Sequence, residues 1–322
     1  MARRRLQVTG GGSYVLTLPK EWVKRHGLGR GAEVVVSVEP DGSLRVSPAG
    51  GGRRRRRWTA SLRFPGGAGA ETVLRRVISF YIAGADVVEV EFEGSPRPGL
   101  VADVKRLVSS KLLGVEVVEE SSRRITFQVV GDESMSGMDA FNRLTKTVEH
   151  MLSDIVLALR EGQGELLREV PQRDDIVDKL FIYVWRQVSS LFLGKRGVGE
   201  VGFDSYVDAS VYMMAAKHAE RIGDHASRLA GALAGGEQAE GLVEPLDEVT
   251  RLYRESVQLL NRPRPERAEE LIQRLESLRL GLDPRRGAAW ESVRRIADYC
   301  TDLLELSLNR ASIALLIGGG GG

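Results

Sequence analysis

The hydrophobic positions divide the chain into three stretches with different periods. Residues 6–46 alternate short apolar runs with Gly, Pro and Asp-Gly turns, a pattern typical of hairpins. Residues 58–132 interleave strand-like and helix-like segments, which predicts a small α/β unit of βαβαββ order. From about Met135 the period becomes 3.6 and stays there, as in the apolar stripe that begins at Phe141. The sequence therefore predicts a β-rich start, an α/β middle and a long helical end.

The helical region carries a weak internal repeat. Six amphipathic segments with short or Gly-rich connections predict helical bundles. The hexapeptide Arg-Ile-Gly-Asp-His-Ala at 221–226 reappears as Arg-Ile-Ala-Asp-Tyr-Cys at 295–300, each time in the last long helix of a three-helix set. This repeat favours two tandem three-helix bundles. We expect a multidomain, mainly α protein whose four domains are a small β domain at 1–50, an α/β domain at 51–132 and three-helix bundles at 133–236 and 237–322.

Composition excludes several classes of protein. With 322 residues of which 42% are hydrophobic, the chain can build ordinary cores, so wholesale disorder is excluded. No apolar run approaches the roughly 20 residues of a membrane-spanning helix, and no signal-peptide core follows the start, so we expect a cytoplasmic protein. A single cysteine, Cys300, cannot form an internal disulfide, and no Cys/His spacing suits a zinc finger.

The net charge of +2 hides an uneven distribution. Residues 1–57 hold 13 Lys and Arg against 4 Asp and Glu, whereas residues 133–322 hold 24 against 30. The basic unit is too short to bury much core, so we expect it to pair with a second copy. A dimer that displays such cations on one face would release counterions from DNA. The alternative is a solvated terminus whose charge serves only solubility.

The motifs of this basic unit resemble a known family. They are S-Y-x-x-x-L-P-K, the following W-V-K, and G-L-x-x-G-x-E-V-V-V. Over most of residues 4–48 the chain is similar to the AbrB/SpoVT swapped-hairpin DNA-binding family, in which two chains interlace their hairpins. The resemblance implies a homodimer that binds double-stranded DNA. It places the phosphate contacts on Arg3, Arg4, Arg5, Lys20, Lys24 and Arg25. The arginines at 53–57 either add phosphate contacts or merely order the linker.

Carboxylates spaced by four are the candidates for chemistry in the helical region. Asp174 and Asp178 share one helix face, and so do Glu220 and Asp224. Clustered oxygen ligands suit Mg, Mn, Fe or Zn ions. At 100° per residue, Glu220 and Asp224 point away from the apolar stripe of their helix, so we expect exposed charges, either plain surface residues or part of a shallow metal site. Asp174 and Asp178 lie at the margin of their stripe, which leaves both interpretations open.

Two segments around these carboxylates resemble the second and third helices of a PhoU repeat. They are QRDDIVDKLFIYVWRQVSSLF and AAKHAERIGDHASRLAGAL, which contain the D/E-x-x-x-D pair and the E-R-I-G-D-H-A sequence of that family. The resemblance implies tandem three-helix bundles and a divalent or transition metal ion, Fe, Zn, Mn or Mg. It marks as ligands Asp174, Asp178, Glu220 and Asp224. In the second repeat Arg294 stands where Glu220 stands in the first, which argues against a second metal site.

Together the two resemblances imply a DNA-binding transcriptional regulator of phosphate uptake, in a combination that looks archaeal. A metal ion, phosphate status, or a phosphate transporter or signalling kinase would act on the helical bundles and change the placement of two DNA-binding units. The alternative is an accessory protein that docks on such a transporter or kinase and uses its N-terminal domain only for dimerisation. An enzyme is not expected, because no nucleophile or base accompanies the carboxylates. The G-x-G-x-x-G at 197–202 joins two helices, so it does not predict dinucleotide binding.

Overall fold

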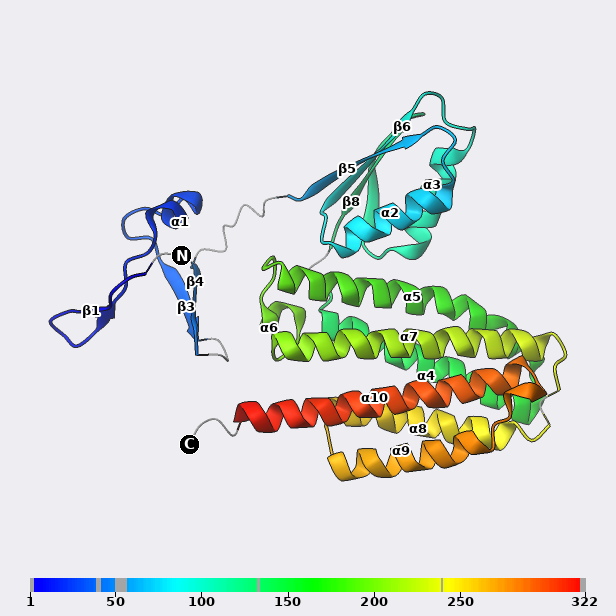
Figure 1. Cartoon of the computed structure of the whole chain (residues 1–322). Helices are drawn as coiled ribbons and strands as arrows, with labels where there is room; N and C mark the ends of the chain where they lie inside the picture. Colours follow the sequence, from blue (N-terminus) through cyan, green and yellow to red (C-terminus); the bar gives the residue numbers. More distant parts are fainter. Residues whose placement is uncertain (1–2, 39–41, 50–56, 132–133, 239, 319–322) are drawn as a thin grey trace. The chain divides into compact units, whose positions relative to one another are not determined.

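The chain forms two compact units, Met1–Arg56 and Arg57–Gly322. The computed structural model describes residues 3–38, 42–49, 57–131, 134–238 and 240–318. The first unit is β-rich, and the second combines an α/β sheet with long helices (Figure 1). None of the described helices is both long and apolar enough to cross a membrane.

The first unit consists of two antiparallel hairpins and one short helix. Its elements are β1 (Gln7–Val8), β2 (Tyr14–Val15), α1 (Lys20–Arg25), β3 (Val34–Val38) and β4 (Leu44–Pro48). β1 pairs with β2 and β3 pairs with β4. None of the described residues of this unit is buried, and Tyr14 and Val38 are 72% and 75% exposed. Two separate two-stranded ribbons offer no second layer, so within one chain their apolar side chains stay in contact with water.

The second unit begins with a four-stranded sheet. Its elements are β5 (Thr59–Pro65), α2 (Ala70–Ile82), β6 (Val87–Glu93), α3 (Leu100–Lys111), β7 (Val115–Glu120) and β8 (Arg124–Val129), which confirms the predicted βαβαββ order. The strands lie in the order β5-β6-β8-β7, with β5 parallel to β6 and the remaining pairs antiparallel. Side chains alternate between the two faces at the β5–β6 pair: Leu62 and Val90 are buried, whereas Arg63 and Glu91 form an ion pair on the opposite face.

The helices that follow form two bundles. They are α4 (Gly137–Glu161), α5 (Gly164–Phe192), the short α6 (Val198–Val201), α7 (Tyr206–Ala234), α8 (Val243–Asn261), α9 (Pro265–Leu280) and α10 (Ala288–Gly318), with the 3-10 turn η1 (Pro284–Arg286) before α10. α4, α5 and α7 pack together, as do α8, α9 and α10, and α7 packs along α10 (Figure 1). This arrangement confirms the predicted tandem three-helix bundles.

Local sequence signals set the ends of the helices that matter most for the site. Ser136 caps α4 and accepts a hydrogen bond from the Asp139 backbone N–H, while the Asp139 carboxylate accepts from the Ser136 backbone in return. Ser205 caps α7 in the same way, accepting from the Asp208 backbone N–H. Gly162 adopts a φ of 69° and ends α4, so α5 can turn back along it.

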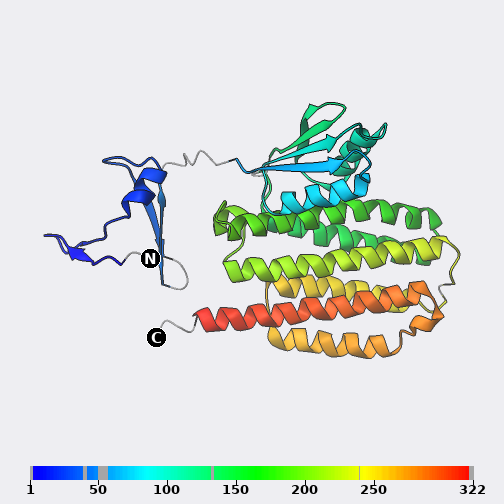
Figure 2. The same cartoon turned by 45° about the horizontal axis from the view of Figure 1, so that its top comes forward.

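The α/β part contacts the first bundle through its two helices. α2 lies between the sheet and α5 in both views (Figure 2), and α3 also contacts α5. The opposite face of the sheet carries polar side chains, among them Ser61, whose hydroxyl donates to Glu89. Helix α5 therefore belongs to two interfaces, one within its bundle and one with the α/β part.

Candidate metal centre and candidate nucleic-acid interface

The four predicted carboxylates lie along the seam between α5 and α7. The two helices run antiparallel, because Phe192 at the end of α5 stacks on Tyr206 at the start of α7. Gly223 keeps the seam tight: a Cβ at this position would lie 3.2 Å from Val177 Cγ1 and 3.6 Å from Asp174 Oδ1. A helix interior favours alanine over glycine, so the absence of a side chain here reflects close packing at the carboxylates.

Three of the carboxylates form one cluster, with the fourth beside it. Asp178, Glu220 and Asp224 each offer an oxygen, and these atoms all lie within 4.8 Å of one another. Asp174 is close enough that Asp178 and Asp224 both raise the pKa of its carboxyl. Its Oδ1 atom is buried and has no hydrogen-bond partner. The structure thus brings all four predicted residues together from two helices.

The expectation that Glu220 is an exposed charge is wrong. Its side chain is only 10% exposed, while that of Asp224 is 31% exposed. A helical wheel assumes one buried stripe, but α7 packs against α4 and α5 and also against α10. Most of its circumference is therefore covered. The buried Glu220 carboxylate accepts hydrogen bonds from Lys217 Nζ at 2.7 and 2.8 Å.

Burial and mutual repulsion disfavour the ionised form of the clustered carboxylates. Burial raises the pKa of Asp174 to about 6, with a further contribution from Asp178 and Asp224. Burial also raises the pKa values of Glu220 and Asp224. A divalent cation would reverse this, because it stabilises ionised carboxylates. The all-oxygen donor set and the orphaned Asp174 Oδ1 therefore fit a hard or borderline divalent ion.

Three basic side chains border the cluster. Lys217 reaches Glu220, Arg221 lies 3.3 Å from Asp224 Oδ2, and Lys111 of α3 donates to Asp178 Oδ2 at 2.9 Å. Lys111 also donates to Asp175 at 2.6 Å. Sequence reasoning missed Lys111, because it comes from the α/β part and no local pattern relates it to α5.

The corresponding carboxylates of the second bundle already have basic partners, two arginines for Asp298 and a histidine for Asp302. Asp298 lies 3.3 Å from both Arg279 and Arg295. Asp302 lies 3.1 Å from His218 Nδ1. In the part of the chain that the structure describes, only the first bundle gathers three possible ligands.

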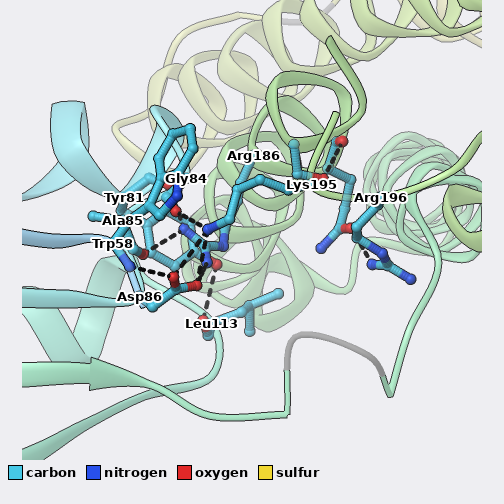
Figure 3. Close-up of polar contacts among 11 residues, drawn as sticks. Trp58, Tyr81, Gly84, Ala85, Asp86, Leu113, Arg186, Lys195 and Arg196 are labelled. Atoms are coloured by element: carbon cyan, nitrogen blue, oxygen red, sulfur yellow. Dashed lines mark hydrogen bonds and ion pairs between the residues drawn. The ribbon is translucent and has the colours of Figure 1, made fainter. Parts of the chain in front are cut away.

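A second set of residues that sequence reasoning missed joins the α/β part to α5 (Figure 3). Arg186 of α5 is 1% exposed and donates to the carbonyls of Tyr81 at 2.6 Å and Ala85 at 2.8 Å, at the C-terminal end of α2. Lys195 donates to Gly84 O at 2.5 Å and to both oxygens of Asp86 at 3.0 Å. Cations at a helix C-terminus satisfy its free carbonyls and interact favourably with its dipole.

The six predicted DNA contacts all lie exposed in the first unit. Arg3, Arg4 and Arg5 precede β1, and the other three lie on α1: Lys20, Lys24 and Arg25. None of the six forms an ion pair with a residue that the structure describes. No described hydrogen bond joins the three arginines before β1 to the three cations of α1. Their charges are therefore available to an external anion. The arginines at 53–56 lie outside the described residues, and Arg57 is exposed.

Comparison with known families confirms the suspected architecture. Residues 141–233 match the PhoU domain family. Residues 7–54 match the family described as antidote-toxin recognition MazE, bacterial antitoxin. No curated protein and no solved structure matches the chain. The chain thus combines a MazE-type N-terminal domain with a PhoU domain, two regulatory families, and this combination fits a regulatory protein.

Proposed function

We propose that the chain is a DNA-binding transcriptional regulator of phosphate uptake. In this proposal a dimeric head at 1–50 binds DNA, and the bundles at 133–236 and 237–322 form a sensor that binds a metal ion or a partner. The α/β domain at 51–132 connects the head to these bundles. The observation that supports it most is the first unit, which shows exposed apolar strands and six cations without a described ion pair. A DNA-binding role would place the protein in the cytoplasm.

Dimerisation of the head would supply the core that one chain lacks. Val36 is 55% exposed and Val38 is 75% exposed on one face of β3, and Leu44 opposite Val38 is 61% exposed. Burying such side chains against a second copy contributes roughly 25 cal/mol per Å² of apolar surface. It would also double the number of cations beside one another. We therefore propose that the homodimer is the DNA-binding form.

Salt dependence of DNA binding tests this function directly. Each neutralised phosphate contributes about −0.9 to the slope of log K against log salt concentration. The variant Arg3→Ala/Arg4→Ala/Arg5→Ala removes six charges per dimer, so its slope should be shallower by up to about 5, with weaker binding. The matched control replaces three exposed arginines of the second unit, Arg123, Arg262 and Arg264.

The binding measurement uses fluorescence anisotropy with duplexes from upstream of this chain's own coding region and of a phosphate transporter, with and without phosphate. The control variant should keep the wild-type slope. An unchanged slope in the Arg3/Arg4/Arg5 variant would reject these residues as phosphate contacts. Indifference of both duplexes to phosphate would remove phosphate as the signal while leaving DNA binding intact.

The metal ion would be held by Asp178, Glu220 and Asp224, with Asp174 beside them. Its positive charge would stabilise the ionised carboxylates and hold α5 against α7 at the seam. The purified wild type should retain a divalent ion, and Asp174→Ala/Asp224→Ala should lose it. The second-bundle variant Asp298→Ala/Asp302→Ala is the matched control and should keep the ion. Equal metal content in all three proteins would reject Asp174 and Asp224 as ligands.

A second candidate function is an accessory protein that docks on a phosphate transporter or signalling kinase. It is favoured by exposed apolar side chains on the same two helices, Trp185 of α5 at 40% and Met214 of α7 at 50%. Under this alternative the N-terminal domain serves only dimerisation, and DNA binding is weak and insensitive to salt. The anisotropy titration therefore also distinguishes the two functions.

A further inference from the structure

The cluster already contains a cation that belongs to the other part of the unit. Lys111 is the last residue of α3, and its side chain is 30% exposed. Its Nζ donates to Asp175 Oδ1 at 2.6 Å and to Asp178 Oδ2 at 2.9 Å. Asp178 is one of the three carboxylates that lie within reach of a common ion. One aspartate is therefore shared between the candidate metal centre and a lysine of the α/β part.

We propose that the Lys111 ammonium competes with the metal ion for the Asp178 carboxylate, so that metal binding weakens the contact between α3 and α5. The inference rests on the proposed metal centre and names how occupancy of that centre would reach the α/β part. In the absence of metal, the ammonium group partly neutralises Asp178. When a divalent ion binds, it is coordinated by the same Asp178 carboxylate and repels the Lys111 ammonium.

Electrostatics makes this competition unavoidable if the centre binds metal. An ion coordinated by Asp178 lies a few ångströms from the Lys111 ammonium, and at that distance like charges repel strongly even in a partly solvated site. The two binding events are linked, so each must weaken the other by the same factor. Lys111 can keep its ion pair with Asp175 when it loses Asp178, since Asp175 is 60% exposed and lies outside the three-carboxylate cluster.

The rest of the junction is arranged so that α3 can loosen while α2 stays in place. Arg186 and Lys195 hold the C-terminal end of α2 and Asp86 through contacts that do not involve the acidic cluster. The described ion pairs between α3 and α5 are those of Lys111. Metal binding would therefore loosen the contact of α3 with α5, while the Tyr81 hydroxyl, which donates to Leu113 O at 2.9 Å, still ties the chain just after α3 to α2.

Titration of the full chain with Mn²⁺ by calorimetry tests the proposal. Lys111→Gln should bind Mn²⁺ about tenfold more tightly than the wild type, because the repulsion is removed. Lys111→Arg keeps the charge and should stay within about twofold of the wild type. The matched control is Lys105→Gln in the same helix, whose lysine pairs with Glu120 at 2.7 Å, and it should also leave the affinity unchanged.

Hydrogen exchange gives a second readout that does not depend on affinity. In the wild type, Mn²⁺ should increase exchange in the last turn of α3 and leave α2 unchanged. In Lys111→Gln that turn should exchange faster already without metal and respond little to Mn²⁺. Equal Mn²⁺ affinity of Lys111→Gln and wild type, or slower exchange in α3 on metal binding, would overturn the proposal.

The aspartate variants separate failure of this inference from failure of the metal centre. If the wild type binds Mn²⁺ and Asp174→Ala/Asp224→Ala does not, while Lys111→Gln matches the wild type, the centre stands and only the competition is overturned. If the wild type binds no Mn²⁺, or binds it equally well without those aspartates, both the centre and the competition are overturned.

Discussion

Replacing the buried Arg186 with methionine should destabilise the second unit more than any substitution of an exposed arginine. Methionine keeps most of the apolar stem but removes the guanidinium group. The carbonyls of Tyr81 and Ala85 then lose donors at 2.6 and 2.8 Å, and Asp86 loses a cation at 3.7 Å. The Tyr81 ring also loses the guanidinium carbon 4.7 Å from its centroid.

The magnitude follows from these lost contacts. The Tyr81 carbonyl still accepts from the Gly84 backbone N–H at 3.0 Å, whereas the Ala85 carbonyl loses its described donor. A buried acceptor left without a donor costs about 1–3 kcal/mol, and breaking a buried ion pair by removing one partner costs about 3–5 kcal/mol. Lys195 still neutralises Asp86 at 3.0 Å, so the ion-pair cost falls at the low end. The free energy of unfolding should therefore fall by about 3 kcal/mol. For a unit of this size that corresponds to a decrease in Tm of roughly 6–12 °C.

Urea unfolding of the full chain, followed by far-ultraviolet circular dichroism, measures the change. Arg168→Met is the matched control, since Arg168 lies on the same helix, is 71% exposed and has its described ion pair with the 85% exposed Glu165. Its effect should stay within about 0.5 kcal/mol. Arg186→Lys should fall between the two, because an ammonium restores one charge without the forked geometry. A loss below about 1 kcal/mol for Arg186→Met would refute the assignment of Arg186 as the anchor of α2.

Three other predictions follow from the same contacts. The pKa of Asp174 is about 6 in the folded chain against an ordinary value of 3.8, so without metal the folded state loses stability as pH rises from about 4 to 7. In urea unfolding, Asp174→Asn should flatten this pH dependence and raise the free energy of unfolding at pH 8 by about 1–2 kcal/mol. An unchanged pH profile would contradict this prediction. Val36→Asp/Val38→Asp should convert the chain to a monomer by light scattering, and a persistent dimer would place the interface elsewhere. Arg310→Gln removes a 2.6 Å ion pair with Asp208 that joins α10 to α7, and it should lower the free energy of unfolding by about 3 kcal/mol. A decrease within experimental error would show that this ion pair does not hold the bundles together.

Much of the second unit was predictable because helices and strands have local periods. The βαβαββ order and the helical bundles followed from apolar spacing between residues a few positions apart, and the structure confirms both. The pairing of Asp174 with Asp178 and of Glu220 with Asp224 also depends only on the geometry of one helix. That the two pairs meet was implied by the PhoU resemblance, and the seam between α5 and α7 brings them together.

Other features depended on which elements pack together. Glu220 is buried because α7 is covered on more than one side, which the period of a single helix does not reveal. The sequence gives no sign that Lys111 lies beside Asp178, 67 residues further along the chain, or that Arg186 lies beside Tyr81. Such contacts arise because residues remote in the chain become neighbours only when helices and sheet form a common core. The sequence alone therefore determined the elements and the chemistry of the carboxylates, whereas tertiary packing decided their burial and their counter-ions.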